Sequence, residues 1–292
     1  MMKKKAMVTG ANGMLADALC PLLIKNGYEL IPTDIAGEEG ITKCDIRDIN
    51  GMLSVVKAAR PEIIFHLAAE TDVDKCELQP EHAYATNWQG TENIAQICKE
   101  LDIAMVYIST GAVFDGEKEG GYKETDKPNP ISIYGMSKLK GEESVRSLLK
   151  RYFIVRAGWM IGGHNKDKKF VWKIVQLLNT KKEISVVTDK TGSPTFTTDF
   201  SQGIVDIVKG GKYGLYHCVN KGICTRYDIA VKIAEYLGRK DVVIKPVTSD
   251  VFPLPAPRGR SEAMLNNNLS KLGLDKTRPW QDALKEYLKA LK

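Results

Sequence analysis

The chain has 292 residues, of which 43% are hydrophobic and 27% are charged, and this balance excludes a largely disordered protein. Its formal net charge is +6 with the basic residues scattered, which favours a small anionic ligand over nucleic acid. No apolar run approaches the roughly 18 residues of a membrane span. We therefore expect no membrane partner.

The six cysteines form no C-x-x-C pair and several lie within apolar runs, as buried thiols do in a reducing compartment. The four histidines are far apart in the sequence, so no metal site is expected. The start of the chain lacks the pattern of a secretory signal. Together these features predict a cytoplasmic protein.

Short apolar runs of strand length alternate with amphipathic segments through residues 6–158. Such alternation is typical of a doubly wound, Rossmann-like α/β fold with a parallel sheet. We expect strands over 6–10, 28–34, 62–69, 104–110 and 152–158. We expect helices over 14–27, 49–59 and 80–101 and around the Tyr134-x-x-x-Lys138 stretch, with Gly27 and the Arg60-Pro61 step ending the first two.

The pattern loosens after Trp159. A polar excursion over 162–169 precedes further helices, strands over 184–189 and 214–220, a proline-crowded stretch over 246–261 and a last helix over 280–292. We expect residues 1–160 to form the dinucleotide-binding domain. Residues 161–292 are predicted to form a smaller, mainly substrate-binding region, with about 197–220 returning to the main sheet.

The first strand ends in a glycine turn, "TGANGMLA". Gly10 and Gly13 allow a tight turn that brings backbone N–H groups at the next helix's N-terminus to a pyrophosphate, and Ala16 stands where a third glycine is usual. Asp34 ends the second strand, 24 residues after Gly10, at a spacing suited to ribose hydroxyls. This carboxylate favours NAD(H) over NADP(H), since it would repel a 2′-phosphate.

The "CDIRD" stretch offers a second contact for the dinucleotide. Asp45 could accept a hydrogen bond from adenine and Ile46 could pack on it, although an aspartate that begins a helix explains Asp45 equally well.

Three further residues suggest proton transfer. Thr110 ends the fourth strand, and Tyr134 and Lys138 are four residues apart on one helical face. A turn cap is the alternative role of Thr110. We expect the lysine charge to lower the pKa of the phenol and the threonine to orient a substrate oxygen. A carbonyl could then take a hydride from a nicotinamide and a proton from Tyr134.

The Gly10-x-x-Gly13 turn, Thr110 and the Tyr134-x-x-x-Lys138 pair resemble the extended short-chain dehydrogenase/reductase superfamily. The stretches "HLAAETDVDKCE", "STGAVFDG", "YGMSKLKGE", "VRAGWMIGG" and "TGSPTFTTDF" resemble, more narrowly, the dTDP-4-dehydrorhamnose reductase family. The resemblance implies NAD(P)H-dependent reduction of the 4-keto group of a nucleotide-linked 6-deoxyhexose. It also implies a homodimer.

The resemblance assigns roles to particular residues. Thr110, Tyr134 and Lys138 would be catalytic, with Lys138 also holding the nicotinamide ribose. Residues lining the dinucleotide would be Gly10, Asn12, Gly13, Met14, Leu15, Asp45, Ile46, Ala68 and Ala69, beside Asp34. Thr71, Val73, Trp159 and Arg258 would approach the sugar nucleotide, although a buried core role also suits Trp159. Asn87 is expected to fix backbone rather than touch substrate.

The chain departs from the family's pattern near the expected sugar pocket. Gly111-Ala112 replace the usual Asp-Tyr, Glu70 replaces a common Tyr, and "PRGRSEAML" replaces an Arg-Arg-Pro-like stretch. Gly111-Ala112 cannot supply the acid pair of a dehydratase, whereas a nucleotide-sugar epimerase stays open. A non-catalytic nucleotide-binding regulatory subunit is the alternative outside catalysis, and the presence of Thr110, Tyr134 and Lys138 argues against it.

Overall fold

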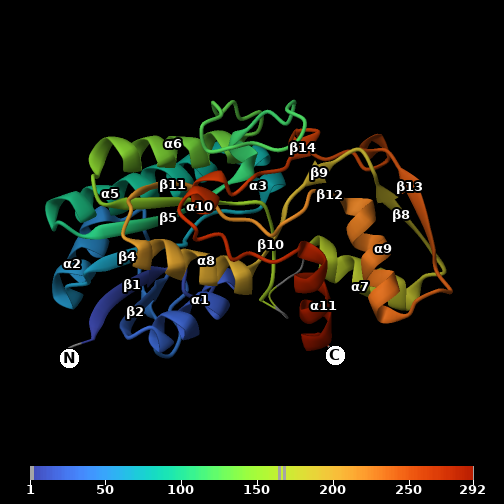
Figure 1. The fold of residues 1–292 in the computed structure, drawn as a ribbon. Helices are drawn as coiled ribbons and strands as arrows, with labels where there is room; N and C mark the ends of the chain where they lie inside the picture. Colours follow the sequence, from blue (N-terminus) through green and yellow to red (C-terminus); the bar gives the residue numbers. More distant parts are fainter. Residues whose placement is uncertain (1–2, 164–165, 167–168, 292) are drawn as a thin grey trace.

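The chain is built around a seven-stranded parallel sheet (Figure 1). A computed structural model describes residues 3–163, 166 and 169–291. The strand order is β11-β6-β5-β4-β1-β2-β3, and all neighbouring pairs are parallel. These strands are β1 (Lys4–Thr9), β2 (Tyr28–Asp34), β3 (Thr42–Lys43), β4 (Ile63–His66), β5 (Ala104–Thr110), β6 (Tyr152–Ala157) and β11 (Gly214–His217). The predicted doubly wound fold is confirmed.

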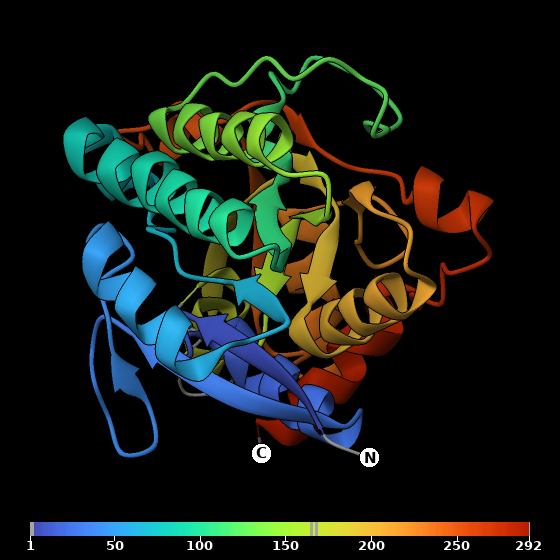
Figure 2. The same ribbon diagram turned by 90° about the vertical axis from the view of Figure 1, so that its left-hand side faces the viewer.

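Helices cover both faces of this sheet, so that it forms the middle of three layers (Figures 1 and 2). One face carries α1 (Met14–Lys25) and α8 (Thr197–Gly210); the other carries α2 (Ile49–Ala59), α5 (Gly90–Glu100) and α6 (Ile133–Leu148). Along β1, Ala6 and Val8 enter the core beneath α1, whereas Met7 enters the opposite core. This alternation follows from the two-residue period of a strand.

Two strands of the main sheet, β2 and β5, and one of its covering helices, α2, have the predicted bounds. The helix predicted over 80–101 is instead divided into α4 (Pro80–Tyr84), a π-helical turn η1 (Ala85–Gln89) and α5. The short helix α3 (Val73–Leu78) was not predicted, because its six residues are too few to show a period. The strand predicted over 62–69 ends at His66, where the chain leaves the sheet at its carboxyl edge.

The π-helical turn carries Asn87, which is fully buried. Its side-chain oxygen accepts from the Glu70 N–H at 2.9 Å, and its Nδ2 donates to the Glu70 carbonyl at 3.0 Å and to Ser137 Oγ at 3.1 Å. Asn87 therefore ties the loop after β4 to α6. The prediction that Asn87 fixes backbone is confirmed.

The rest of the C-terminal half packs around a second apolar core, between α7 (Phe170–Thr180), α9 (Arg226–Leu237), α11 (Trp280–Ala290) and β8 (Glu183–Val187). Strand β8 pairs with β13 (Val243–Val247), and β7 (Trp159–Ile161) pairs with β10 (Pro194–Phe196). Strand β9 (Thr191–Gly192) lies between β12 (Cys224–Thr225) and β14 (Ser261–Glu262). Shorter elements are η2 (Gly111–Val113), η4 (Ser249–Val251) and α10 (Asn267–Lys271).

Part of the polar excursion predicted over 162–169 falls on residues 164–165 and 167–168, which lie outside the described residues. Within the described ranges, no helix has both the length and the apolar character that a bilayer crossing requires.

The strand order reverses between β1 and β4, since the chain runs from β1 toward β3 on one side and from β4 toward β11 on the other. The loops that follow these two strands diverge at such a point and leave a crevice at the carboxyl edge of the sheet. A Cβ built on Gly10 would lie 2.7 Å from the Ala68 nitrogen, so the two loops are in direct backbone contact. The fold therefore places the predicted glycine turn at the mouth of this crevice.

Candidate active site

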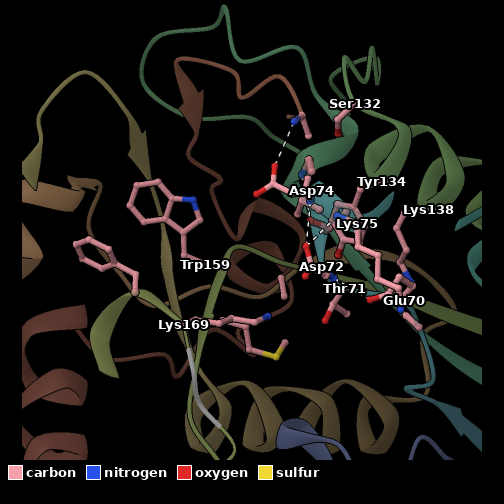
Figure 3. A pocket seen from close by; sticks show the side chains of 18 of the residues that line it. Glu70, Thr71, Asp72, Asp74, Lys75, Ser132, Tyr134, Lys138, Trp159 and Lys169 are labelled. Carbon is pink, nitrogen blue, oxygen red and sulfur yellow. Dashed lines mark hydrogen bonds and ion pairs between the residues drawn. The ribbon is translucent and has the colours of Figure 1, made fainter. Parts of the chain in front are cut away.

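A cavity of about 1950 Å³ lies between the carboxyl ends of the main strands and the C-terminal half (Figure 3). All residues that the sequence predicted for catalysis, dinucleotide binding or substrate binding line it, and their roles stay predictions. They are Gly10, Asn12, Gly13, Met14, Leu15, Asp34, Asp45, Ile46, Ala68, Ala69, Thr71, Val73, Thr110, Tyr134, Lys138, Trp159 and Arg258.

The glycine turn forms a cradle that side chains would fill. Gly10 has a φ of +72°, which L-residues rarely adopt, and the Ala68 backbone leaves no space for a Cβ there. The Gly13 N–H donates to the Gly10 carbonyl at 3.0 Å, and Gly13 precedes α1 without a side-chain cap. Amide groups at the start of α1 are thus left for an anion, which fits the pyrophosphate of a dinucleotide.

Asp34 holds the turn together from the end of β2. Its carboxylate accepts from the backbone N–H groups of Asn12 and Ala36, each at 3.1 Å. Asn12 Nδ2 in turn donates to the Ala36 carbonyl at 2.9 Å. The carboxylate keeps further acceptor capacity toward the cavity, since each oxygen has a second lone pair.

Asp45 is engaged by a neighbour. The Arg47 guanidinium donates to both carboxylate oxygens at 2.6 to 3.0 Å, and these hydrogen bonds hold the pKa of Asp45 below its ordinary value. The helix that follows is capped by Asp48 instead, so Asp45 does not begin it.

The residues predicted for proton transfer meet where β5 and α6 come together. Thr110 ends β5, and its side chain lies near that of Tyr134, the second residue of α6, close enough to act on the pKa of the phenol. Thr110 Oγ1 also accepts from the Ala112 N–H at 3.1 Å, which is the turn-capping role. A Cβ built on Gly135 would lie 2.1 Å from the Ala112 carbonyl oxygen. This glycine therefore permits the close approach of α6 that brings Tyr134 to Thr110.

Lys138 lies one turn along α6 from Tyr134, on the same side of the cavity (Figure 3). Its side chain is buried, and Nζ lies 4.2 Å from the centroid of the Tyr107 ring. Burial lowers the pKa of Lys138 to about 7, against a raising effect of the Glu142 carboxylate. The protonated and neutral forms of Lys138 are therefore close in free energy near neutral pH.

The expectation that the pKa of Tyr134 lies below its ordinary value is wrong for this structure. Desolvation raises the pKa of Tyr134 well above its ordinary value, and the nearby Thr110 side chain offsets only part of that rise. Desolvation disfavours the charged form of both side chains, so it acts in opposite directions on their pKa values. At neutral pH Tyr134 is consequently a neutral phenol, the form that holds a proton to give.

A buried ion pair supports this part of α6. Glu142 and Arg156 are both fully buried, and Arg156 donates from Nε and Nη2 to the two Glu142 oxygens at 2.7 Å each. Arg146 adds a third hydrogen bond to Glu142 at 2.8 Å. Because Arg156 belongs to β6, the pair fixes α6, and with it Lys138, against the sheet.

The loop after β4 brings Thr71 and Val73 to the cavity beside Glu70. The Glu70 carboxylate accepts from Lys75 Nζ at 2.7 Å and lies 3.3 Å from His82 Nε2, and the pKa of this mostly buried acid is lowered by its hydrogen bonds. Glu70, which departs from the family's pattern, is thus a charged member of the cavity wall.

Trp159 and Arg258 line the cavity from the C-terminal half. The Trp159 side chain is 9% exposed, its Nε1 donates to Glu262 at 3.2 Å, and the Arg226 guanidinium lies 3.7 Å from its ring centroid. Arg258 forms an ion pair with Asp74 of α3 at 2.9 Å. Both residues are thus positioned by partners distant in the sequence.

Glu262 and Arg226 are among the lining residues that the sequence analysis did not identify. Glu262 belongs to the two-residue strand β14, and Arg226 is the first residue of α9. The capping box formed by Thr225 and Asp228 marks the start of α9 in the sequence, but nothing in the local sequence shows that Arg226 faces the cavity.

Residues 4–292 match the family model described as "RmlD substrate binding domain". The chain belongs to this family. The RmlD family assignment confirms the resemblance drawn from the motifs. The dTDP-4-dehydrorhamnose reductase of Mycolicibacterium smegmatis is 32% identical, over 99% of this chain and 86% of that protein.

Solved structures agree with this assignment. A dTDP-4-dehydrorhamnose reductase from Clostridium acetobutylicum is 37% identical with a TM-score of 0.92, covering 98% of this chain and 99% of that one. The enzyme of the same name from Bacillus anthracis, solved in complex with NADP, is 35% identical with a TM-score of 0.92, covering 99% and 100% of the two chains.

Proposed function

We propose that this RmlD-family chain reduces the 4-keto group of a nucleotide-linked 6-deoxyhexose with NADH or NADPH. The observation that carries the proposal is the half-buried Tyr134 phenol beside Thr110, with Lys138 one helical turn away, in the same cavity as the uncapped glycine turn. A protonated phenol beside a dinucleotide cradle is suited to ketone reduction. The names of the relatives supply the substrate class.

The dinucleotide, when bound, supplies the hydride. The backbone around Gly10 and Gly13 would hold its pyrophosphate, and Asp34 its adenosine ribose. Residues 1–160 would hold the dinucleotide and residues 161–292 would mainly hold the sugar nucleotide.

Each of the three catalytic side chains has a distinct task. Thr110 holds the substrate oxygen and Tyr134 transfers its hydroxyl proton to that oxygen. The resulting phenolate is stabilised by the Lys138 ammonium, which also donates to the nicotinamide ribose.

A panel assay tests the proposal. Purified protein is incubated with 4-keto-6-deoxyhexoses linked to dTDP, UDP, GDP and CDP, with NADH and with NADPH, and loss of the reduced nicotinamide absorbance is followed. We expect consumption of one reduced cofactor per sugar reduced, starting with the dTDP-linked substrate. No consumption at high enzyme concentration with any of them removes the proposal. Sugar isomerisation without net cofactor consumption would instead identify an epimerase.

We further propose that the protein is a cytoplasmic homodimer. The support is the superfamily resemblance and six free cysteines within the described residues, four of them buried. Light scattering coupled to gel filtration measures the mass directly, and a monomer at micromolar concentration contradicts the dimer.

A further inference from the structure

Arg226 places a guanidinium on the cavity wall between two aromatic rings. Its central carbon lies 3.7 Å from the Trp159 ring centroid and 4.9 Å from that of Phe170. All three residues line the cavity. Stacking on aromatic faces fixes the plane of a guanidinium but uses none of its five N–H donors.

Several other cations of the cavity wall have carboxylate partners. These ion pairs are Arg47 with Asp45, Lys75 with Glu70, Lys166 with Asp17 and Arg258 with Asp74. Arg226 differs from them, because no carboxylate among the described residues lies within 4.0 Å of it and no described group accepts a hydrogen bond from it. Glu262 is the carboxylate whose charge acts on it most strongly, from beyond ion-pair distance.

Placing an arginine charge in this setting without a partner costs solvation free energy. Arg226 is half-buried, and desolvation lowers its pKa to about 10, so the charge has lost part of its hydration. Buried charges in folded proteins are normally paired and hydrogen-bonded. The planar fork of a guanidinium matches the oxygens of a phosphate or carboxylate. An anionic group of a ligand in the cavity would complete the pairing that the protein itself does not supply.

The position of Arg226 suits one part of the ligand. Trp159 lies across the cavity from Tyr134 and Lys138 (Figure 3), and Arg226 stacks on Trp159. The Glu262 carboxylate acts electrostatically on both Tyr134 and Arg226, so both lie within range of this one group. The phosphates of the dinucleotide itself would bind at the glycine turn. A sugar that presents its keto group to Tyr134 would therefore extend its diphosphate toward Arg226.

We propose that Arg226 binds a phosphate of the substrate's nucleoside diphosphate and so determines specificity for a sugar carried on that group. This inference rests on the proposed function and adds to it the residue that recognises the carrier. Arg226 is a binding residue here and takes no part in proton transfer.

Binding measurements on Arg226→Met test the proposal. Isothermal titration gives the Kd of dTDP, UDP and GDP, each beside its phosphate-free nucleoside, and of NADPH. Because Arg226→Met loses a charge-assisted, bidentate contact, its Kd for the diphosphate that wild type binds best is expected to rise by about 10- to 100-fold. The Kd of the nucleoside and of NADPH should stay within about twofold. In turnover, KM for the sugar nucleotide should rise while kcat changes little.

Two further variants control for charge and folding. Arg239→Met removes the same charge just beyond the end of α9, outside the cavity, and should leave every Kd unchanged. Arg226→Lys keeps the charge but not the planar fork of the guanidinium, so its affinity for the diphosphate should lie between those of wild type and Arg226→Met. An unchanged diphosphate Kd in Arg226→Met, or an equal loss for nucleoside and NADPH, overturns the inference. If Arg226→Met does not fold, wild-type affinity in Arg226→Lys overturns it.

The two proposals fail in different ways. If wild type reduces a nucleotide-linked ketosugar and Arg226→Met keeps the same KM, only the Arg226 inference fails. If wild type reduces nothing in the panel, the proposed function fails, and if it also binds none of the diphosphates, both fail.

Discussion

Replacing Glu142 by glutamine tests how the buried ion pair holds the catalytic helix. Glutamine is nearly isosteric with glutamate, so the substitution removes charge and leaves the volume of the core unchanged. Arg156 would then stay fully buried without its carboxylate, while its Nη1 would still lie 3.3 Å from His217 Nε2. Leaving one member of a buried ion pair alone is strongly destabilising, because its desolvation is no longer compensated.

The expected size follows from the contacts. Two buried hydrogen bonds from Arg156 and one from the half-exposed Arg146 lose their ionised acceptor. The free energy of unfolding should fall by about 3 kcal/mol, the low end for an orphaned buried charge because the amide oxygen still accepts one bond. At roughly 2 to 4 °C per kcal/mol, Tm should fall by about 10 °C.

Urea and thermal denaturation of four variants measure the effect. Glu143→Gln, at the exposed neighbouring position of α6, should change stability by less than about 0.5 kcal/mol. Arg156→Met added to Glu142→Gln should restore part of the loss, since it removes the uncompensated charge. A Glu142→Gln protein as stable as wild type, or a double variant that loses the sum of both single effects, refutes the reasoning.

Three further predictions follow from the site. Because burial lowers the pKa of Lys138 from 10.5 to about 7, the folded chain binds fewer protons than the unfolded chain between these values, and this group's contribution to stability rises with pH across that window. Lys138→Met should therefore gain most stability over wild type near pH 6 and least near pH 10 in urea denaturation, and a constant difference contradicts this. Gly135→Ala should lower kcat by about 100-fold, because its Cβ would displace the start of α6 from the Ala112 carbonyl; a kcat near wild type in the folded variant excludes this role. Wild type should favour NADH over NADPH in kcat/KM, and Asp34→Ala should shift that ratio toward NADPH by about tenfold; an unchanged ratio shows that Asp34 does not select the cofactor.

The sequence was sufficient for features set by short-range patterns. The bounds of β2, α2 and β5 follow from apolar runs ended by turns, glycine or a step to proline, and the glycine turn follows from spacing. The Tyr134-x-x-x-Lys138 pair is likewise local, since four residues along a helix share a face. These features place the candidate site at the carboxyl edge of the sheet before any contact is known.

Features that depend on burial or on partners distant in the sequence could not be predicted from the sequence. The sign of the pKa change at Tyr134 depends on desolvation by surrounding elements, which the spacing to Lys138 does not contain. Arg226 can be recognised as a candidate binding residue only in the folded chain. Folding places Trp159 and Phe170 against it, and no carboxylate among the described residues lies within ion-pair distance of it. The π-helical turn is also tertiary in origin, as its Asn87 contacts come from other elements.

The most direct test of the central claim is single-turnover reduction of the preferred 4-ketosugar nucleotide by Tyr134→Phe. The substitution removes one hydroxyl from a half-buried ring and leaves the dinucleotide cradle intact. The account predicts a fall in the rate of hydride transfer of about 100- to 10,000-fold, with the Kd of cofactor and of dTDP within about twofold of wild type. A rate within about fivefold of wild type, with binding intact, would show that Tyr134 does not supply the proton.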